Sequence, residues 1–492
     1  MSDAVAKSDR ESDGPADARA EEALRELATF FDAVAAHERQ QRRGTSTYHR
    51  LVQGIHHSIV AAGARVLEIG CGCGDLLAAV RPSYGVGIDI SPEMIAAAGA
   101  RHPELEFAVA AGESFISEET FDYVILSDVV PFAHDLLALF NNIGRMTDRR
   151  SRVIVHSYSQ LWRPVIRVAE LLGVKQRLPV RNWVNAGDVE NLLALADFEV
   201  VTRTRRILLP VLPLLSTLFN GVLASVPPFS WFCLTYWVVA RPRPQPGEGD
   251  VSVSVVVPAR NEAGTIAEIV ERVAELGSGT ELIFVEGGST DDTCNEIKRQ
   301  IELHPERRIA LYQQSGRGKA DAVRLGFDQA QGDILSILDA DLSVAPEDLM
   351  SFYDAVVSGR ADLANGSRLV YGQEPGAMQS LNVFGNKFFS WVFSWLMDQP
   401  VKDTLCGTKV LWRSDYERIA AGRKELGDLD PFGDFDLLLG AARLQLKIVD
   451  VPIRYGARTY GSTNISRFRH GLLLLKMAGV GFRKLKVAPV RL

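Results

Sequence analysis

The chain has 492 residues, of which 47% are hydrophobic and 23% are charged, and its formal net charge is −7. This length predicts two to three domains with apolar cores, and the mildly acidic balance argues against a nucleic-acid-binding protein. The five cysteines form no disulfide pattern, which favours a reducing cytoplasm.

The first residues of the chain differ in composition from the rest. Residues 1–20 are polar, charged and poor in aromatic residues, which predicts a disordered tail that is not a secretion signal. An apolar strand over residues 66–69 then leads into a turn with three glycines and a helix. A second strand ends at Asp89, whose carboxylate can accept both hydroxyls of a ribose. Together these features predict a nucleoside-binding pocket.

The glycine turn has the form E-x-G-x-G-x-G. Residues from about 45 to 240 resemble a class I methyltransferase that uses S-adenosyl-L-methionine, which implies a Rossmann-like α/β fold. By this resemblance, the glycines line the cofactor's methionine and ribose, the aspartate holds the ribose, and the first glutamate supports the turn. The cofactor site would then comprise Glu68, Gly70, Gly72, Gly74, Asp89 and Glu113.

The methyl acceptor is harder to identify from the sequence. Ala111 stands near the position where the family often has an acid for the adenine amine, and Glu113 lies two residues later. His134 and His156 come after the next two strands, at the edge of the sheet where ligands bind. Each is a candidate general base, and the alternative is that both are buried structural histidines.

A long apolar segment closes the first half. Residues 207–240 contain four prolines, which favours a buried helix and a last strand over a membrane-spanning helix, with contact at a membrane surface as the alternative. Three prolines between residues 241 and 250 predict an extended linker. We therefore expect a methyltransferase-like domain over residues 21–240 and a second domain over residues 251–492.

The second half repeats the strand–turn–helix pattern and then reaches a pair of acids. The apolar run "ILSIL" ends in Asp339 and Asp341. Two carboxylates one residue apart at a strand end point to the same side and can bind one hard cation. A divalent ion such as Mn²⁺ or Mg²⁺ would stabilise a departing diphosphate.

Several segments of this half resemble glycosyltransferase family 2, the inverting enzymes with a GT-A fold. They are "VVVPARNE", "VEGGSTDD", "GKADAVRLGF", "LDADLS" and "NGSRLV". The resemblance implies that Asp341 binds the metal and that Asp339 contacts the donor or the metal. It also implies a nucleotide-sugar site made of Pro258, Ala259, Arg260, Glu262, Glu286 and Lys319. Glu286 stands where the family usually has an aspartate that reads the base.

The next region of the chain bears on the acceptor. Residues 385–419 resemble the subset that glycosylates polyprenyl phosphates, and by that resemblance Arg368 and Arg458 bind the acceptor phosphate. The alternative is a soluble glycan or metabolite, with Asp434 or Asp436 as the base. The apolar stretch 388–397 suits a helix at a bilayer surface or, alternatively, a core helix.

Residues 470–492 combine an apolar run with several basic residues, which predicts attraction to anionic lipids or a solvated basic tail. The sequence thus predicts a bifunctional enzyme that binds a nucleoside-diphosphate sugar and a polyprenyl phosphate, and no nucleic acid. We expect it to work from the cytoplasm, at the inner face of the membrane. A further alternative is that the methyltransferase-like half is a non-catalytic binding or regulatory module.

Overall fold

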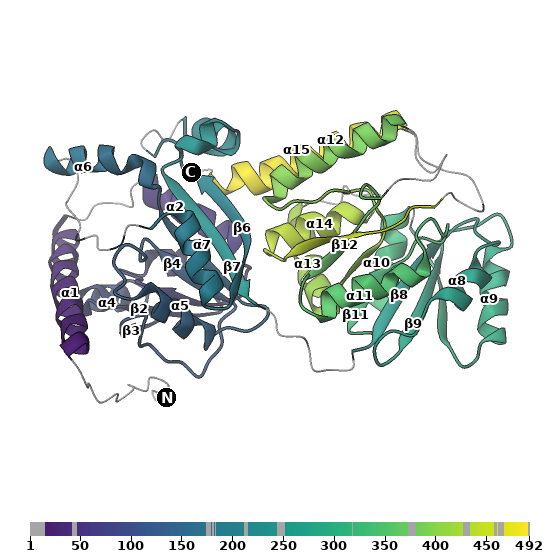
Figure 1. Cartoon of the computed structure of the whole chain (residues 1–492), viewed down its shortest axis with the longest axis horizontal. Coiled ribbons are helices and arrows are strands. Elements are labelled where there is room, and N and C mark those ends of the chain that lie inside the picture. The colour runs from purple at the N-terminus through teal and green to yellow at the C-terminus, as the bar shows by residue number, and fades with distance from the viewer. Residues whose placement is uncertain are drawn as a thin grey trace. The chain divides into compact units, whose positions relative to one another are not determined.

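The computed structural model describes residues 15–41, 47–173, 179, 182, 184–210, 215–243, 251–316, 318–371, 380–426, 433–456, 460 and 467–490. The chain divides into two compact units, each with its own sheet (Figure 1). The first unit contains Met1–Arg243 together with Leu485–Leu492, and the second contains Pro244–Lys484. This division confirms that the chain forms two α/β domains.

The first unit is built on a seven-stranded sheet in the order β3-β2-β1-β4-β5-β7-β6. Strand β7 runs antiparallel to both β5 and β6, whereas the other pairs of neighbouring strands are parallel. The order reverses between β1 and β4, and ligands of such sheets bind outside the carboxyl ends of the strands at that point. The strands are β1 (Arg65–Ile69), β2 (Tyr84–Asp89), β3 (Glu106–Val109), β4 (Tyr123–Ser127), β5 (Arg152–Tyr158), β6 (Phe198–Arg206) and β7 (Thr235–Pro242).

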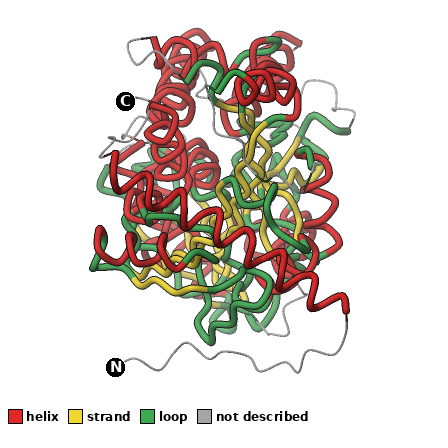
Figure 2. Tube along the Cα trace, turned by 90° about the vertical axis from the view of Figure 1, so that its left-hand side faces the viewer, coloured by secondary structure: helices red, strands yellow, loops and turns green. Residues whose placement is uncertain are grey.

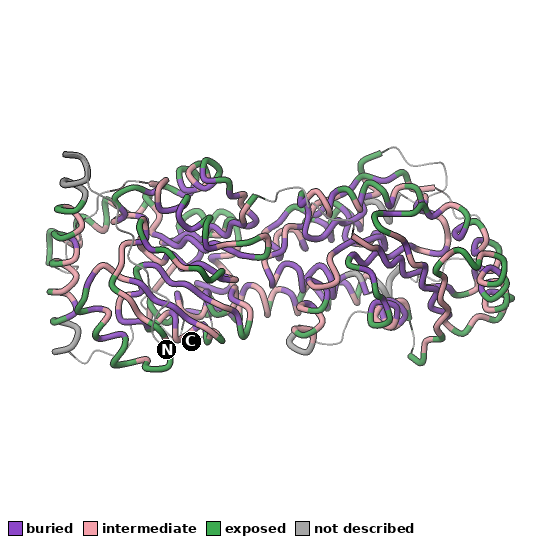
Figure 3. The backbone as a smooth tube through the Cα atoms, turned by 90° about the horizontal axis from the view of Figure 1, so that it is seen from below, coloured by how far each residue is buried: buried purple, intermediate pink, exposed green. Residues whose placement is uncertain are grey.

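Helices cover both faces of this sheet, so its central strands β1, β4 and β5 are largely buried on both sides (Figure 3). The helices are α1 (Pro15–Gln41), α2 (Thr47–Ile59), α3 (Asp75–Val80), α4 (Pro92–Arg101), α5 (Leu136–Gly144), α6 (Arg163–Leu171) and α7 (Ala186–Leu195). Short helical turns complete the unit: η1 (Gln160–Trp162), η3 (Thr217–Val222), η4 (Leu223–Ser225), η5 (Phe229–Phe232), part of η7 (Phe482–Val487), and η8 (Ala488–Val490).

Helix α1 occupies part of the segment that the sequence predicted to be disordered. It begins at Pro15, whereas residues 1–14 lie outside the described part of the chain. The helix crosses one side of the first unit (Figure 2) and packs on α4. Asp32 accepts a hydrogen bond from the hydroxyl of Ser91 and one from the backbone N–H of Glu93. Phe31 meets Phe132 edge to face, with 5.4 Å between ring centroids. These contacts hold α1 over the carboxyl edge of the sheet.

The segment before β7 differs from the predicted buried helix. Its described residues form the short turns η3, η4 and η5, and several of their apolar side chains are exposed. The prolines of this segment prevent a long uninterrupted helix. The predicted final strand is present as β7, which includes Arg241 and Pro242 of the predicted linker, and residues 244–250 lie outside the described part.

Residues 485–490 pack into the first unit, although the sequence analysis assigned them to the second domain. Val490 is 1% exposed and joins the apolar cluster on α2. The backbone of Pro489 lies so close to α2 that a Cβ at Gly54 would come within 2.5 Å of the Pro489 carbonyl oxygen. Lys486 is buried as well. In this segment the expected basic tail is therefore a packed element and not a solvated one.

The second unit is built on a seven-stranded sheet in the order β10-β9-β8-β11-β13-β12-β14, in which β13 runs antiparallel to both neighbours. The strands are β8 (Val253–Ala259), β9 (Thr280–Glu286), β10 (Arg308–Gln313), β11 (Ile334–Ile337), β12 (Leu363–Ser367), β13 (Lys409–Trp412) and β14 (Ile448–Pro452). The helices are α8 (Ile266–Arg272), α9 (Thr293–Leu303), α10 (Lys319–Gln329), α11 (Leu349–Val357), α12 (Ser380–Met397), α13 (Arg413–Leu426), α14 (Asp434–Arg443) and α15 (Arg467–Gly481), with the turn η6 (Pro346–Asp348).

Helices α12 and α15 lie side by side in the second unit (Figure 1). Trp395 stacks on Phe482 with ring centroids 5.7 Å apart, and Phe393 is buried against Phe435. The other side of α12 leaves Trp391 69% exposed. The helix is therefore both a core element and an exposed apolar surface. Within the described residues, no helix combines the length and the apolar character needed to cross a membrane.

Candidate active sites

The glycine turn after β1 and the acid after β2 form one wall of a cavity in the first unit. Gly70 and Gly72 have φ angles of +71° and +53°, which glycine adopts without strain. The N–H of Gly72 donates to Oδ2 of Asp89 at 3.0 Å, and that of Ser91 donates to Oδ1 at 2.9 Å. A Cβ at Gly72 would meet no atom within 4 Å, so space for a ligand begins at this backbone.

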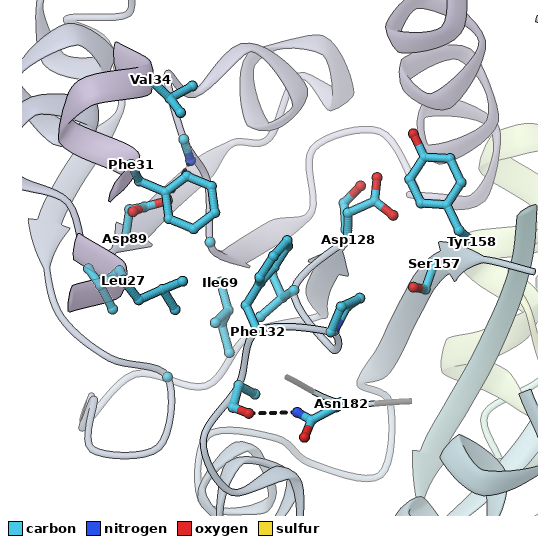
Figure 4. A pocket seen from close by; sticks show the side chains of 18 of the residues that line it. Leu27, Phe31, Val34, Ile69, Asp89, Asp128, Phe132, Ser157, Tyr158 and Asn182 are labelled. Atoms are coloured by element: carbon cyan, nitrogen blue, oxygen red, sulfur yellow. Dashed lines mark hydrogen bonds between the residues drawn. The ribbon is translucent and has the colours of Figure 1, made fainter. Parts of the chain in front are cut away.

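The cavity has a volume of about 600 Å³ and lies along the carboxyl ends of β1, β2, β4 and β5 (Figure 4). Leu27, Phe31 and Val34 of α1 form an apolar wall near Asp89. Because α1 was not part of the resemblance, sequence reasoning did not indicate this wall.

Two of the predicted cofactor residues support the turn and do not line the cavity. Glu68 is 2% exposed, and burial raises the pKa of its carboxyl well above the ordinary value. Gly74 lies against Phe107, since a Cβ there would come within 2.7 Å of the ring. The cavity itself is lined by Gly70, Gly72, Asp89 and Glu113 from the predicted set.

Glu113 lines the cavity but also braces the loop after β4. Its Oε1 accepts the N–H of His134 at 2.9 Å and the N–H of Asp135 at 3.4 Å. Ala110 and Gly112 on either side of Ala111 contribute to the same wall.

Neither of the two candidate histidine bases lines the cavity. His134 is exposed and contributes only its backbone to the Glu113 contact. His156 is fully buried, lies 3.0 Å from the hydroxyl of Ser127, and stacks on Trp237 with ring centroids 4.2 Å apart. Burial lowers the pKa of His156 well below its ordinary value. The alternative interpretation, a structural histidine, fits His156 better.

A cluster of polar side chains at the other end of the cavity was missed by sequence reasoning. Asp128 directly follows β4 and has a φ of +59°, a strained conformation that often marks functional sites. The hydroxyl of Tyr48 donates to Oδ2 of Asp128 at 3.2 Å, and the Tyr48 ring stacks on Tyr158 at 5.5 Å. Burial, followed by the charge of Asp128, raises the pKa of both tyrosines, so both phenols remain protonated.

In the second unit, the ends of β8 and β9 bring several predicted donor residues together. Ala259 pairs with Glu286 in the parallel register of these strands, and Pro258 precedes it on β8. The N–H of Glu262 donates to Oγ1 of Thr293 at 2.9 Å. Glu286 is 6% exposed, and its Oε1 accepts the N–H of Ser289.

Arg260 is exposed beside these residues, at the turn that follows β8. The Glu286 carboxylate holds the turn that follows β9 through the N–H of Ser289. The predicted donor residues of β8 and β9 thus share one sheet edge.

The two acids after β11 have different partners. Asp339 forms an ion pair with Lys319, whose Nζ lies 2.5 Å from Oδ1. Burial by itself raises the pKa of Asp339, but the charges of Lys319, Arg368 and Lys409 outweigh it and hold that pKa below its ordinary value. Oδ1 of Asp341 accepts the N–H of Ser343 at 3.0 Å and its hydroxyl at 2.6 Å.

The loop before β13 closes on the Lys319–Asp339 pair, which the sequence did not indicate. A Cβ at Gly407 would collide with both Nζ of Lys319 and Oδ2 of Asp339. Only glycine lets this backbone approach the pair so closely.

Arg368 is largely buried and forms a bidentate ion pair. Its Nε donates to Oδ2 of Asp403 at 2.7 Å and its Nη2 to Oδ1 at 3.0 Å. The guanidinium also lies over the ring of Tyr455, 5.0 Å from its centroid. Although burial lowers the pKa of Arg368, the Asp403 charge raises it above the ordinary value. The predicted phosphate ligand is thus anchored by a carboxylate that sequence reasoning missed.

Of the two predicted base candidates, only Asp436 has a described side chain. Asp436 is 8% exposed and accepts hydrogen bonds from Arg423 at 2.6 Å and Arg324 at 3.3 Å. A carboxylate held by two arginines is poorly suited to take a proton from an acceptor. Arg458 and the side chain of Asp434 lie outside the described residues.

Comparison with known proteins finds a different protein family in each half of the chain. Residues 254–417 match the model of "Glycosyl transferase family 2". Glycosyltransferase AglJ of Haloferax volcanii is 30% identical over 220 residues, which cover 44% of this chain and 67% of AglJ.

The chain belongs to glycosyltransferase family 2.

A second relative is matched over most of its own length. Polyprenol monophosphomannose synthase of Mycolicibacterium smegmatis is 28% identical over 235 residues, which cover 46% of this chain and 86% of that protein. The chain spans 67%, 34% and 51% of the lengths of three Haloferax volcanii glycosyltransferases, AglJ, AglD and Agl6.

Residues 66–149 match the model of a "Methyltransferase domain". The putative methyltransferase in a Haloferax volcanii complex with the activator Trm112 covers 44% of this chain and 97% of its own length, with 19% identity and a TM-score of 0.34. This family 2 glycosyltransferase is therefore fused to a methyltransferase, an assignment that rests on the family models and the strand orders described above.

The expected divalent metal can be compared with the residues of the family 2 site. Within the described ranges, no three His, Cys, Asp or Glu side chains gather as a metal site. Asp341 offers a hard oxygen ligand at the strand end, whereas Asp339 is already paired with Lys319. This donor set fits a cation that takes most of its ligands from a diphosphate.

Proposed function

We propose that the second unit transfers a sugar, with inversion and with the help of Mn²⁺ or Mg²⁺, from a nucleoside-diphosphate sugar to a polyprenyl phosphate. We further propose that the first unit methylates a small molecule or a glycan with S-adenosyl-L-methionine. The observation that carries the proposal is the site after β11, where Nζ of Lys319 lies 2.5 Å from Oδ1 of Asp339 and the charges of Arg368 and Lys409 act on the same carboxylate. Such a concentration of cations suits a reaction between two phosphorylated molecules.

In the proposed donor site, the nucleotide lies along the turns after β8 and β9. Arg260 and the backbone around Ala259 would contact it, with Glu286 shaping the base pocket. Asp341 would hold the metal, which would neutralise the diphosphate as it leaves. Lys319, oriented by Asp339, would lie beside the same phosphates. The bond from the anomeric carbon to the diphosphate oxygen breaks as the acceptor oxygen attacks from the opposite side.

A phosphate acceptor suits this site because it is already anionic near neutral pH, so it needs no base. The pairing of Asp436 with Arg423 and Arg324 leaves that carboxylate unsuited to act as one. The ion pair with Asp403 uses Nε and Nη2 of Arg368, which are two of the three nitrogens of the guanidinium. The Nη1 edge would then be the part of Arg368 that contacts the acceptor phosphate, with Arg458 as the second proposed ligand.

A lipid-linked acceptor also fits the surface of α12 and α15. Phe388 is 45% exposed, Trp391 69%, Leu472 71% and Leu475 52%. Aromatic and leucine side chains on such a surface suit shallow burial at the boundary of a bilayer. We therefore propose that the protein acts peripherally, at the inner face of the membrane. The relatives that include polyprenol monophosphomannose synthase support this choice of acceptor.

In the first unit, the cavity fits S-adenosyl-L-methionine at the end formed by Gly70, Gly72 and Asp89, because the backbone at Gly72 faces open space. The bound cofactor would supply an electrophilic methyl group. The cluster of Tyr48 and Asp128 at the other end would position the acceptor. If the acceptor is a hydroxyl, the Asp128 carboxylate would receive its proton, while the protonated phenol of Tyr48 holds that carboxylate in place.

A donor screen tests the proposed sugar transfer. Purified protein with Mn²⁺ is incubated with a panel of nucleotide sugars and either undecaprenyl phosphate or soluble sugar acceptors, and products are separated by phase partition. We expect organic-phase product with one donor, and its loss in Asp341→Ala. The same variant should bind S-adenosyl-L-methionine like the wild type in calorimetry. Full activity of Asp341→Ala would contradict the metal assignment, and transfer only to soluble acceptors would contradict the lipid.

A further inference from the structure

Helix α6 of the first unit has its polar side toward the cavity and its apolar side toward solvent. Arg163, Ile166, Arg167 and Glu170, spaced as one helical face, line the cavity that contains the proposed cofactor site. A surface helix of a globular protein normally has the opposite orientation, with its apolar stripe toward the core. The reversed orientation of α6 indicates that its outer face has a partner.

The outer face of α6 and the preceding turn is strongly apolar. The exposed fractions are 54% for Leu161, 56% for Val165, 54% for Val168, 86% for Leu171 and 72% for Leu172. Apolar side chains at spacings of three and four residues form a continuous strip along the helix. Each of these side chains loses its favourable burial free energy while the face remains in water.

A second exposed apolar group adjoins this strip. In η5, Phe229 is 45% exposed, Trp231 59% and Phe232 53%. The indole Nε1 of Trp162, at the start of α6, donates to the carbonyl oxygen of Phe232 at 2.9 Å. The hydrogen bond joins the two segments, and we call their exposed apolar side chains together the α6–η5 surface.

Arginines lie next to the α6–η5 surface. Arg163 and Arg167 are the cations of α6, against one acid, Glu170. Arg205 is exposed and shares a small cavity of about 220 Å³ with Leu161. Tryptophan, phenylalanine and leucine together with arginine are the side chains of helices that lie in the plane of an anionic membrane surface.

We propose that the α6–η5 surface docks the methyltransferase unit on an anionic lipid bilayer. One side of α6 would rest in the headgroup region, while its other side forms a wall of the cavity. The methyl-acceptor end of that cavity, which Arg163 and Arg167 help to line, would then open near the lipid headgroups. The methyl acceptor is accordingly a lipid-borne anion, and this last part rests on the proposed function of the first unit.

Vesicle sedimentation with the full chain tests the docking. The vesicles contain phosphatidylglycerol and phosphatidylcholine, and the test variant is Val168→Glu with Leu172→Glu, two exposed positions outside the cavity lining. The matched control is Leu195→Glu, which is 61% exposed on α7 of the same unit. We expect at least a roughly tenfold loss of vesicle binding in the test variant and wild-type binding in the control. Calorimetric binding of S-adenosyl-L-methionine verifies that both variants are folded.

Trp391→Glu on α12 separates this inference from the proposed membrane contact of the second unit. If that variant abolishes vesicle binding while the α6 variant binds like the wild type, the docking proposal is overturned and the lipid acceptor of sugar transfer stands. The docking is also overturned if the wild-type protein does not sediment with the vesicles. The same holds if the wild type is a dimer that binds no vesicles and the α6 variant is a monomer, because the surface would then be a contact between two copies of the chain.

A second arm tests the acceptor class with vesicles carrying undecaprenyl phosphate, the active nucleotide sugar and tritiated methyl donor. Tritium in the organic phase with the wild type, and its loss with the α6 variant, would support a lipid-borne methyl acceptor. Tritiated product that is found only in the aqueous phase would contradict a lipid-borne acceptor. Sugar transfer is measured in the same sample, so a failure of the proposed glycosyltransferase activity is recognised separately.

Discussion

Replacing Asp403 by asparagine should strongly destabilise the second unit. The Asp403 side chain is 0% exposed and that of Arg368 is 12% exposed, so the substitution leaves a buried guanidinium without its charge partner. Removing one member of a buried ion pair costs about 3–5 kcal/mol. At roughly 2–4 °C per kcal/mol for a unit of this size, the melting temperature should fall by about 10 °C. Differential scanning calorimetry of the full chain measures this shift.

The double variant Arg368→Met/Asp403→Asn completes a thermodynamic cycle. Its loss of unfolding free energy should be smaller than the sum of the losses in the two single variants, because neither charge is then buried alone. Asp354→Asn, at an exposed position of α11, is the control and should change stability by less than about 0.5 kcal/mol. A cost below about 1 kcal/mol for Asp403→Asn would refute the argument, since it would mean that solvent screens the pair.

The same pair predicts a pH dependence. Burial alone raises the pKa of Asp403, but the charge of Arg368 more than offsets this effect and lowers it below the ordinary value. A lowered folded-state pKa gives stability that is fully present above the unfolded value of about 4 and is lost as pH falls through the folded value. The difference between wild type and Asp403→Asn should therefore be constant from about pH 6 to 8 and shrink below about pH 4.

Three further substitutions test the sites and the packing. Gly72→Ala should weaken S-adenosyl-L-methionine binding at least about tenfold in calorimetry, because the new Cβ enters the open space of the cavity. Gly63→Ala is the control: Gly63 also has a positive φ, +72°, and open space at its Cβ, so this variant has the same kind of backbone strain but should bind the cofactor normally. Lys319→Met should weaken binding of the nucleotide sugar about tenfold in fluorescence titration, with unchanged methyl-donor binding as the control. Val490→Ala should destabilise the first unit by about 2 kcal/mol in thermal unfolding, and an unchanged unfolding temperature would contradict the packing of residues 485–490 on α2.

The features that sequence reasoning predicted correctly are those encoded by short, regular patterns. Strand β1, the glycine turn and Asp89 lie within 25 residues of one another, and their order alone indicates a ligand-binding sheet edge. The acids after β11 were found in the same way. Both predictions depend on chain direction and on the alternation of strands and helices, and both of these can be read directly from the sequence.

The contacts that were missed join distant parts of the chain. Tyr48 meets Asp128 across 80 residues, and Arg368 meets Asp403 across 35. No local periodicity encodes such a pair, because either partner alone resembles an ordinary surface residue. The same reason explains His156, which the sequence analysis placed after a strand but which lies within β5, buried against Trp237.

The packing of residues 485–490 on α2 affects how the protein is made. A ribosome releases the whole second unit, Pro244–Lys484, before it releases the segment whose Val490 packs in one apolar cluster with Leu51 and Ile55. The methyltransferase unit therefore completes its core only after the glycosyltransferase unit has been synthesised. A chain interrupted anywhere in the second half would leave apolar side chains of α2 uncovered, and such exposed surface marks the fragment for chaperones and proteases.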